Sequence, residues 1–170
     1  MSENLCVSTL DPRPTLPSAA LGLAAFGVAA AVAAVTGNLA ALSAADQYGA
    51  LTQPAWAPPP WLFGPVWTVL YVSIAVAGWL VWRRAGWSGA RTALSVFAVQ
   101  LVLNALWTPL FFGAGLFGVA FVEIVALWLS IVATIVLFAR HSRPAAALLL
   151  PYLAWVTFAS ALNLAIWVLN

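Results

Sequence analysis

The stretch WAPPPWLFGPVWTVLY, Trp56–Tyr71, combines a proline triplet with the start of a long apolar run. Proline fixes φ and carries no backbone N–H, so it is well tolerated in the first turn of a helix, where the N–H groups have no partner inside the helix. Pro58–Pro60 therefore predict a stiff, extended approach and a helix that begins close to Trp61. The run Pro60–Arg83 is long enough to cross a hydrocarbon core of about 30 Å, which needs roughly 20 helical residues.

The rest of the chain repeats this apolar pattern. Hydrophobic residues make up 65% of the 170 residues and charged residues 6%, and the mean hydropathy is +1.04. Soluble domains, in contrast, carry about 25% charged residues. The sequence therefore predicts an all-α membrane protein, a bundle of five transmembrane helices formed by residues 18–170. The predicted spans are Ser18–Leu42, Pro60–Arg83, Arg91–Phe112, Leu116–Arg140 and Ala145–Leu169.

The segment before Ser18 differs from the rest of the chain in composition. It carries three prolines and several charged residues, and it lacks the basic start and short apolar core of a signal peptide. We predict that residues 1–17 form a disordered N-terminal tail. Cys6, the only cysteine, lies in this tail, so the sequence predicts neither an intramolecular disulfide nor a cysteine metal cluster.

The basic residues are distributed asymmetrically. With five spans, the tail and the loops after the second and fourth spans lie on one side of the membrane. They contain every basic residue, namely Arg13, Arg83, Arg84, Arg91, Arg140 and Arg143. Because cytoplasmic loops carry an excess of Lys and Arg, we predict that the tail is on the cytoplasmic side of a prokaryotic cell membrane. A net charge of +2 without a clustered basic face argues against nucleic-acid binding.

The polar side chains inside the spans gather at one depth. A polar group is costly in hydrocarbon and marks either helix packing or function. Counting about 1.5 Å per residue from the Arg-free end, polar residues of four spans fall in the same half of the membrane. They are Asn38, Gln100, Asn104, Thr108, Glu123 and Asn163. The spacing i, i+4, i+8 places Gln100, Asn104 and Thr108 on one stripe of their helix.

Aromatic residues fall at the same depth. Phe63, Trp67 and Tyr71 follow the spacing i, i+4, i+8 on the second span. Trp107 lies beside the polar stripe, and the fifth span carries aromatic, small and amide side chains within one quadrant. Apolar walls with a few polar groups are typical of ligand sites. The predicted ligand-binding residues are Phe63, Trp67, Tyr71, Gln100, Asn104, Trp107, Tyr152, Trp155, Ala159 and Asn163.

A purely structural interpretation of these polar residues stays open. Asn, Gln and Thr in membrane helices commonly hydrogen-bond to a neighbouring helix and contribute about 0.6 to 2 kcal/mol each. Glu123 is a functional hypothesis by default, because it is ionisable and lies inside a span. At a depth of about 10 Å its side chain can also reach the headgroups.

The connection between the first two spans, Ser43–Ala57, is the longest in the chain. It lies on the Arg-free side, directly above the polar half of the spans. Long loops in compact folds are usually functional or disordered, and Tyr48, Pro54 and Trp56 give this one side chains that can pack. We predict that it forms a lid loop over the ligand site.

Three segments resemble the motifs of one protein family. The residues Gln53–Tyr71, with their regularly placed tryptophans and prolines, resemble the second-helix signature of the tryptophan-rich sensory protein family. This family is also called TspO/MBR, translocator protein or peripheral benzodiazepine receptor. QLVLNALWTPLFFG, Gln100–Gly113, and PYLAWVTFASALN, Pro151–Asn163, resemble its third- and fifth-helix motifs. The likeness covers about Ser18–Asn170 in the same order.

The resemblance implies a five-helix bundle, usually dimeric, whose pocket beneath the first loop binds porphyrins, sterols and isoquinoline carboxamides. By motif position it implies the pocket residues Trp67, Gln100, Asn104, Trp107, Tyr152, Trp155 and Ala159. Some family members degrade protoporphyrin in light, and by the same correspondence Trp67 and Trp155 are the catalytic candidates.

The chain departs from the family pattern at three positions. Leu164 and Val168 stand where animal members carry the Tyr and Arg of a sterol-recognition pattern, and Gln53 replaces a usual Lys. The pattern is a weak predictor even when complete. Its absence lowers the expectation of tight sterol binding, and Gln53 removes one cation that would face an anionic ligand.

The leading hypothesis is a membrane receptor or carrier that binds tetrapyrroles, protoporphyrin IX or haem, and related hydrophobic ligands for sensing, transport or disposal. The alternatives are a light-dependent porphyrin-degrading enzyme and a structural protein that binds membrane partners. The spans contain no conventional acid–base pair or activated nucleophile, and the only histidine, His141, lies at the opposite surface. The sequence therefore predicts no metal site and no required cofactor. The predicted partners are the porphyrin, membrane lipid and a second copy in a homodimer.

Overall fold

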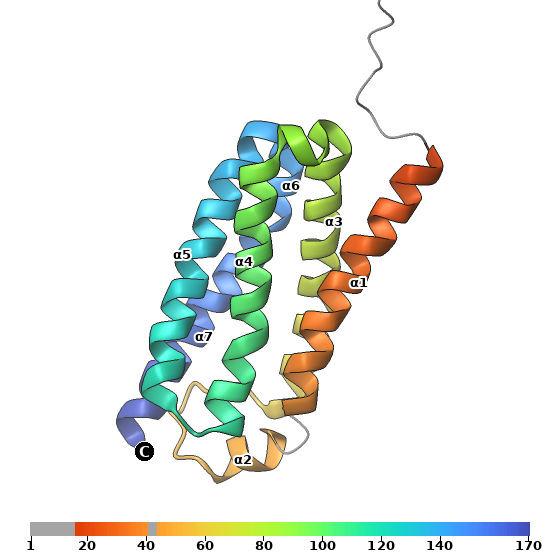
Figure 1. The fold of residues 1–170 in the computed structure, drawn as a ribbon. Helices are drawn as coiled ribbons and strands as arrows, with labels where there is room; N and C mark the ends of the chain where they lie inside the picture. The colour runs from red at the N-terminus through yellow and green to blue at the C-terminus, as the bar shows by residue number, and fades with distance from the viewer. Residues whose placement is uncertain (1–15, 41–43) are drawn as a thin grey trace, which may run out of the picture.

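The computed structural model describes the backbone of residues 16–40 and 44–170 and the side chains of residues 19–36 and 47–170. Within these ranges the chain is helical and contains no strand (Figure 1). The predicted tail up to residue 15 and the side chain of Asn38 lie outside the described residues. The elements are α1 Leu16–Ala40, α2 Ala44–Ala50, the 3-10 turn η1 Pro60–Leu62, α3 Phe63–Gly89, α4 Arg91–Thr108, the π-helical turn η2 Pro109–Gly113, α5 Phe117–His141, α6 Arg143–Leu148 and α7 Leu150–Leu169.

The prediction of five membrane spans is confirmed. Five helical segments of the described chain are long and apolar enough to cross a bilayer, namely Ala19–Thr36, Pro60–Gly89, Arg91–Gly113, Phe117–His141 and Arg143–Leu169. The last of them consists of α6 and α7, which meet at Leu149. Pro151 lies in the first turn of α7. Because proline has no N–H and its ring clashes with the carbonyl four residues earlier, it accounts for the break.

The proline triplet acts as the sequence predicts. Pro59 is extended, with φ −65° and ψ 147°, and helical structure begins at Pro60 and continues into α3. The far end of α3 differs from the prediction, because the helix continues beyond Arg83 to Gly89. Gly86 has φ +65° inside this extension. Only glycine adopts that conformation readily, so Gly86 bends the chain and leaves Ala90 as the sole residue between α3 and α4.

Figure 1 shows how the helices are arranged. α3, α4, α5 and α7 form the body of the bundle, α1 leans against α3 and α4, and α2 crosses the end at which α7 finishes. The described arginines lie at the other end, where α3 and α5 finish and α4 and α6 begin. They are Arg83, Arg84, Arg91, Arg140 and Arg143, and all are exposed.

Two clusters of buried side chains hold the bundle together. The larger one joins α3, α4, α5, α6 and α7 around residues such as Ile74, Phe97 and Phe138. The smaller one lies beneath α2 and contains Tyr48, Phe111, Ala120, Leu162 and Ile166. Lipid is as apolar as these side chains, so close packing rather than exclusion from water favours helix association.

Gly78 shows how close that packing is. A β-carbon at this position would lie 2.7 Å from Phe26 Cδ1 of α1 and 2.9 Å from Phe97 Cζ of α4. Such distances are well below van der Waals contact. The absence of a side chain at Gly78 therefore lets α1 and α4 approach α3 at this level of the bundle.

Candidate functional site

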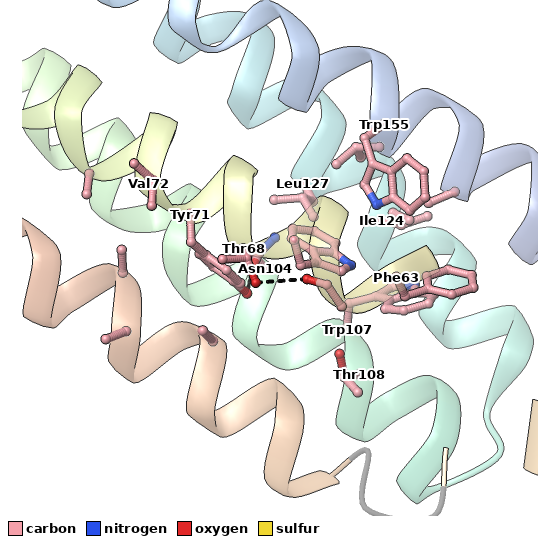
Figure 2. Close-up of a pocket in the computed structure, with 18 of the residues that line it drawn as sticks. Phe63, Thr68, Tyr71, Val72, Asn104, Trp107, Thr108, Ile124, Leu127 and Trp155 are labelled. Atoms are coloured by element: carbon pink, nitrogen blue, oxygen red, sulfur yellow. Dashed lines mark hydrogen bonds between the residues drawn. The ribbon is translucent and has the colours of Figure 1, made fainter. Parts of the chain in front are cut away.

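A cavity of about 640 Å³ lies inside the half of the bundle nearest α2 (Figure 2). Its walls come from α1, α3, α4, α5 and α7, and Tyr48 of α2 closes the end. Seven of the predicted ligand-binding residues line it: Phe63, Trp67, Tyr71, Asn104, Trp107, Trp155 and Ala159. Thr108, which the sequence places on the polar stripe, lines it as well.

Gln100, Tyr152 and Asn163, which the sequence predicts as ligand contacts, lie outside the cavity lining. They are almost completely buried, with exposed fractions of 1%, 0% and 1%. Tyr152 and Asn163 each hydrogen-bond to a lining residue, and Gln100 hydrogen-bonds to Tyr152. The structure therefore places these three side chains behind the wall rather than on it.

A chain of hydrogen bonds runs from the cavity wall into the core. The Tyr71 hydroxyl donates to Asn104 Oδ1 at 2.6 Å (Figure 2). Asn104 Nδ2 donates to the Tyr152 hydroxyl, which in turn donates to Gln100 Oε1, each at 3.0 Å. These bonds satisfy groups that would be costly if left unpaired in a low-dielectric interior. Tyr152 and Gln100 thus hold the two lining residues, Tyr71 and Asn104, in place.

The second polar contact behind the wall belongs to Trp107. Its Nε1 donates to Asn163 Oδ1 at 3.1 Å, and Asn163 Nδ2 donates to the Phe117 carbonyl at 2.9 Å. The Trp107 ring also stacks on Phe111, with the centroids 4.9 Å apart and an interplanar angle of 25°. Contacts with η2 and α7 therefore fix this indole.

The remaining aromatic rings of the wall pack in two groups. Trp67 lies 5.4 Å from Tyr71 and meets Tyr152 edge-on at 6.1 Å. Phe63 meets Trp155 edge-on at 5.7 Å. Offset and edge-to-face pairs at such distances are the favourable arrangements of aromatic rings. The wall on α3, α4 and α7 is therefore made of rings that support one another.

The contribution of α1 is not predicted by the sequence analysis. Gly27, Ala30, Ala31 and Ala34 line the cavity, facing the aromatic wall. Their small side chains carry no chemical signal, and alanine is frequent all along α1. Some lining residues of α1 and α3 are exposed, including Ala31 and Val72. The cavity is therefore open on the side between these two helices.

The predicted lid loop packs onto the bundle. Tyr48 is 3% exposed, its ring meets Phe63 edge-on at 5.5 Å, and its hydroxyl donates to the Pro58 carbonyl at 3.2 Å. Burial raises the pKa of Tyr48 above its ordinary value of 10.0, which keeps the hydroxyl protonated and able to donate. Gln53 Nε2 donates to the Tyr48 carbonyl. Tyr48 is thus the residue of this loop that closes the cavity.

Pro54 and Trp56, also predicted in the lid, do not line the cavity. Trp56 is 51% exposed and meets Phe158 of α7 edge-on, with the centroids 5.7 Å apart. Its ring therefore fixes the loop to the outer face of α7. Pro54 is half-buried and accepts a hydrogen bond from the Ala57 N–H at 2.9 Å.

Two polar side chains at this level have no hydrogen-bond partner among the described residues. One is Trp155, whose Nε1 is buried and unpaired although its ring lines the cavity. Both carboxyl oxygens of Glu123 are buried too, so this side chain does not extend to the headgroups, and it is not among the lining residues. A buried donor without an acceptor costs about 1 to 3 kcal/mol.

The described residues contain no cluster of three or more His, Cys, Asp or Glu side chains that could hold a metal ion. His141 lies at the end of α5, opposite the cavity. The lining consists of aliphatic and aromatic residues with a few hydroxyl and amide groups. Its chemistry therefore suits the binding of a flat hydrophobic molecule.

Comparison with known proteins matches residues 24–168 to the TspO/MBR family. The "Tryptophan-rich protein TspO" of Archaeoglobus fulgidus is 45% identical over 123 residues, which cover 72% of this chain and 79% of the archaeal protein. The "Translocator protein" of Ovis aries is 41% identical over 122 residues, 71% of this chain and 72% of the sheep protein. The "Tryptophan-rich sensory protein" of Cereibacter sphaeroides is 38% identical over 138 residues, covering 81% and 84% respectively.

Proposed function

The chain belongs to the TspO/MBR family, and we propose that it binds tetrapyrroles such as protoporphyrin IX in the cavity beneath α2. The resemblance in the three sequence motifs is confirmed by the family match, and the five apolar spans make the protein a multi-pass integral membrane protein. The tetrapyrrole, and haem or a sterol as further ligands, are part of the proposal.

One observation carries the proposal. Seven aromatic residues line the cavity, namely Tyr48, Phe63, Trp67, Tyr71, Trp107, Phe112 and Trp155, and the small residues of α1 line it as well. A flat macrocycle placed between these walls has aromatic faces to stack on, and the described lining residues of α1 put only glycine and alanine against it. A volume of about 640 Å³ lies within the roughly 300 to 1,000 Å³ of typical ligand pockets.

The polar groups of the cavity fit the edge of a tetrapyrrole. Trp155 Nε1 has no acceptor among the described residues, and Thr108 offers a hydroxyl on the same lining. The Thr108 hydroxyl can donate to an oxygen atom of a propionate, whereas Trp155 Nε1 is itself buried and reaches such an oxygen only if the indole turns. The described lining residues include no His, Cys or Met, which are common axial ligands of haem iron. Stacking and hydrogen bonding therefore carry the proposed recognition.

The biological role that we propose is sensing, transport or disposal of the tetrapyrrole in a prokaryotic cell membrane. The arginines at the end opposite α2 support an orientation with that end in the cytoplasm. On this orientation the cavity lies in the outer half of the membrane. The homodimer that the family resemblance implies remains a prediction, which the mass of the detergent-purified protein would test.

The test is a titration of the detergent-purified protein with protoporphyrin IX, followed by tryptophan fluorescence quenching. Asn104→Leu removes a polar group from the wall and Trp155→Leu removes a ring. We expect each variant to bind roughly tenfold more weakly, because about 1.4 kcal/mol of contact is lost. Trp87→Leu is the matched control, since Trp87 is 55% exposed and lies far from the cavity lining. Saturable quenching that none of the three changes affects would place the ligand elsewhere.

A second candidate function is light-dependent breakdown of the bound porphyrin. It is favoured by the position of Trp67 and Trp155, the two catalytic candidates, which both line the cavity. Trp67→Phe and Trp155→Phe keep an aromatic ring but remove the more easily oxidised indole. If the wild type converts protoporphyrin IX under light into a product with a new absorption band, and either variant fails to form that product, the activity is supported. Unchanged rates in both would exclude these residues from it.

A further inference from the structure

Trp107 and Trp155 both present their rings to the cavity, but only one has its indole N–H paired. Trp155 Nε1 lacks an acceptor among the described residues, whereas Trp107 Nε1 donates to Asn163 Oδ1 at 3.1 Å. Asn163 is 1% exposed and does not line the cavity. The Trp107 ring is therefore fixed by a residue that a ligand in the cavity does not touch.

The orientation of the Asn163 amide is determined from both sides. An indole N–H can only donate and a backbone carbonyl can only accept. Asn163 Oδ1 must therefore face Trp107, and Nδ2 must face the Phe117 carbonyl, to which it donates at 2.9 Å. Trp107 belongs to α4, Phe117 to the first turn of α5 and Asn163 to α7. One buried amide thus joins three helices at the level of the cavity.

The contacts of Trp107 divide into two kinds. Phe111 stacks on the ring at 4.9 Å and Phe112 meets it edge-on at 6.1 Å, and both contacts restrict the plane of the indole. Neither contact is directional within that plane. The hydrogen bond to Asn163 restricts rotation of the indole within its plane, because N–H···O bonds weaken steeply when the angle departs from linear. Asn163 therefore determines which edge of the indole faces the cavity.

From this geometry we infer that Asn163 is a positioning residue, which holds Trp107 in the orientation that a cavity ligand contacts. The inference rests on the proposed function, since it assumes that a ligand stacks against this wall. It replaces the role predicted from the sequence, in which Asn163 touches the ligand. If Asn163 acts only through Trp107, a change at Asn163 should affect ligand binding only while Trp107 is present, and this dependence can be measured.

The first test is a double-mutant cycle on the affinity for protoporphyrin IX. Asn163→Leu keeps the approximate volume and removes both hydrogen bonds, and Trp107→Phe keeps an aromatic ring and removes the indole N–H. We expect Asn163→Leu to weaken binding about fivefold, the usual effect of one lost hydrogen bond. In the Trp107→Phe background the same change should have no further effect, because residues that act through one another are not additive. Independent, multiplying losses would overturn the inference.

Thr157→Val is the matched control for a loss of stability. Trp128 Nε1 donates to Thr157 Oγ1 at 2.8 Å, so this substitution also removes an indole hydrogen bond between α5 and α7. Neither residue lines the cavity. We expect Thr157→Val to lower the melting temperature without changing the affinity for the porphyrin. An equal loss of affinity in Thr157→Val and Asn163→Leu would mean that Asn163 acts through bundle stability alone.

A ligand-free measurement separates this inference from the proposed function. In protein labelled with 5-fluorotryptophan, the Trp107 resonance is identified by its absence in Trp107→Phe. We expect Asn163→Leu to shift or broaden the Trp107 resonance and to leave the Trp128 resonance unchanged. An unchanged Trp107 resonance would overturn the positioning role even if the porphyrin binds. Conversely, a protein that binds no porphyrin but shows the Trp107 shift would refute the proposed function and leave the positioning of Trp107 established.

Discussion

Thr52 and Asn170 are joined by two hydrogen bonds although 118 positions separate them. The Thr52 N–H donates to Asn170 Oδ1 at 2.9 Å, and Asn170 Nδ2 donates to the Thr52 carbonyl at 3.1 Å. Asn170 follows the last turn of α7, and Thr52 lies in the loop that carries Tyr48. The pair therefore ties the loop that closes the cavity to the end of α7.

We predict that Asn170→Leu speeds the release of a bound porphyrin. Both hydrogen bonds to Thr52 are lost, and each contributes about 0.5 to 1.5 kcal/mol, so the loop opens more often. Dissociation should become roughly five- to tenfold faster in stopped-flow displacement. Val168→Leu is the control, because Val168 is 76% exposed on the same turn of α7. Equal dissociation rates in the wild type and Asn170→Leu would show that the loop does not limit release.

We predict that Tyr152→Phe weakens ligand binding although Tyr152 does not line the cavity. The change leaves Asn104 Nδ2 and Gln100 Oε1 without the partner they share. A buried group without its partner costs about 1 to 3 kcal/mol, which should lower the melting temperature and release Tyr71 from its fixed position. Thermal unfolding and porphyrin titration measure the two effects. A variant with wild-type affinity would show that the positions of Tyr71 and Asn104 do not depend on the hydrogen bonds of Tyr152.

We predict that Ala31→Leu abolishes porphyrin binding while the protein still folds. Ala31 lines the cavity opposite the aromatic wall, and a leucine there would occupy the space of the ligand. Ala29→Leu adds the same side chain to an exposed position of α1 outside the lining. Only the first variant should lose fluorescence quenching by protoporphyrin IX. Binding that survives Ala31→Leu would exclude this side of the cavity from the ligand site.

We predict that Gly78→Ala destabilises the bundle by about 1 to 3 kcal/mol, the usual effect of overpacking. The new methyl group would lie 2.7 Å from Phe26 and 2.9 Å from Phe97, and it would force α1 and α4 apart. Gly49→Ala is the control, because no atom lies within 4 Å of a β-carbon at that position of α2. Thermal unfolding in detergent should separate the two variants. Equal melting temperatures would mean that α1 adjusts its position without cost.

Much of the architecture follows from the sequence for identifiable reasons. A helix in lipid must be long and apolar, and Pro58–Pro60 mark where one begins. The spacing of Phe63, Trp67 and Tyr71 places them on one helix face, and all three line the cavity. Depth and face are properties of a single helix, so they can be predicted before the packing of the other helices is known.

The residues placed differently from the prediction depend on contacts between helices. Tyr152 and Asn163 of α7 contact Asn104 and Trp107 of α4, which line the cavity, but they do not line it themselves. Periodicity gives the direction of a side chain and not what covers it. Tyr48 faces inward from the short helix α2, and Trp56 faces α7 from the irregular turn that follows. Neither direction is predicted, because the sequence analysis predicts a loop here and α2 is too short to show a clear period.

The described residues that α1 turns to the cavity are glycine and alanine only, and this affects the range of molecules that fit. Such a face offers no protruding group that must match a groove in the ligand. The helix itself is held against α3 and α4 by Phe26, which packs on Gly78 and meets Phe97 edge-on, so this smooth wall stays at a fixed distance from the rings. The rings of α3, α4 and α7 are braced by one another and by buried amides. The site consequently makes few demands on the surface relief of the ligand face that lies against α1, and it is selective on the side of the rings.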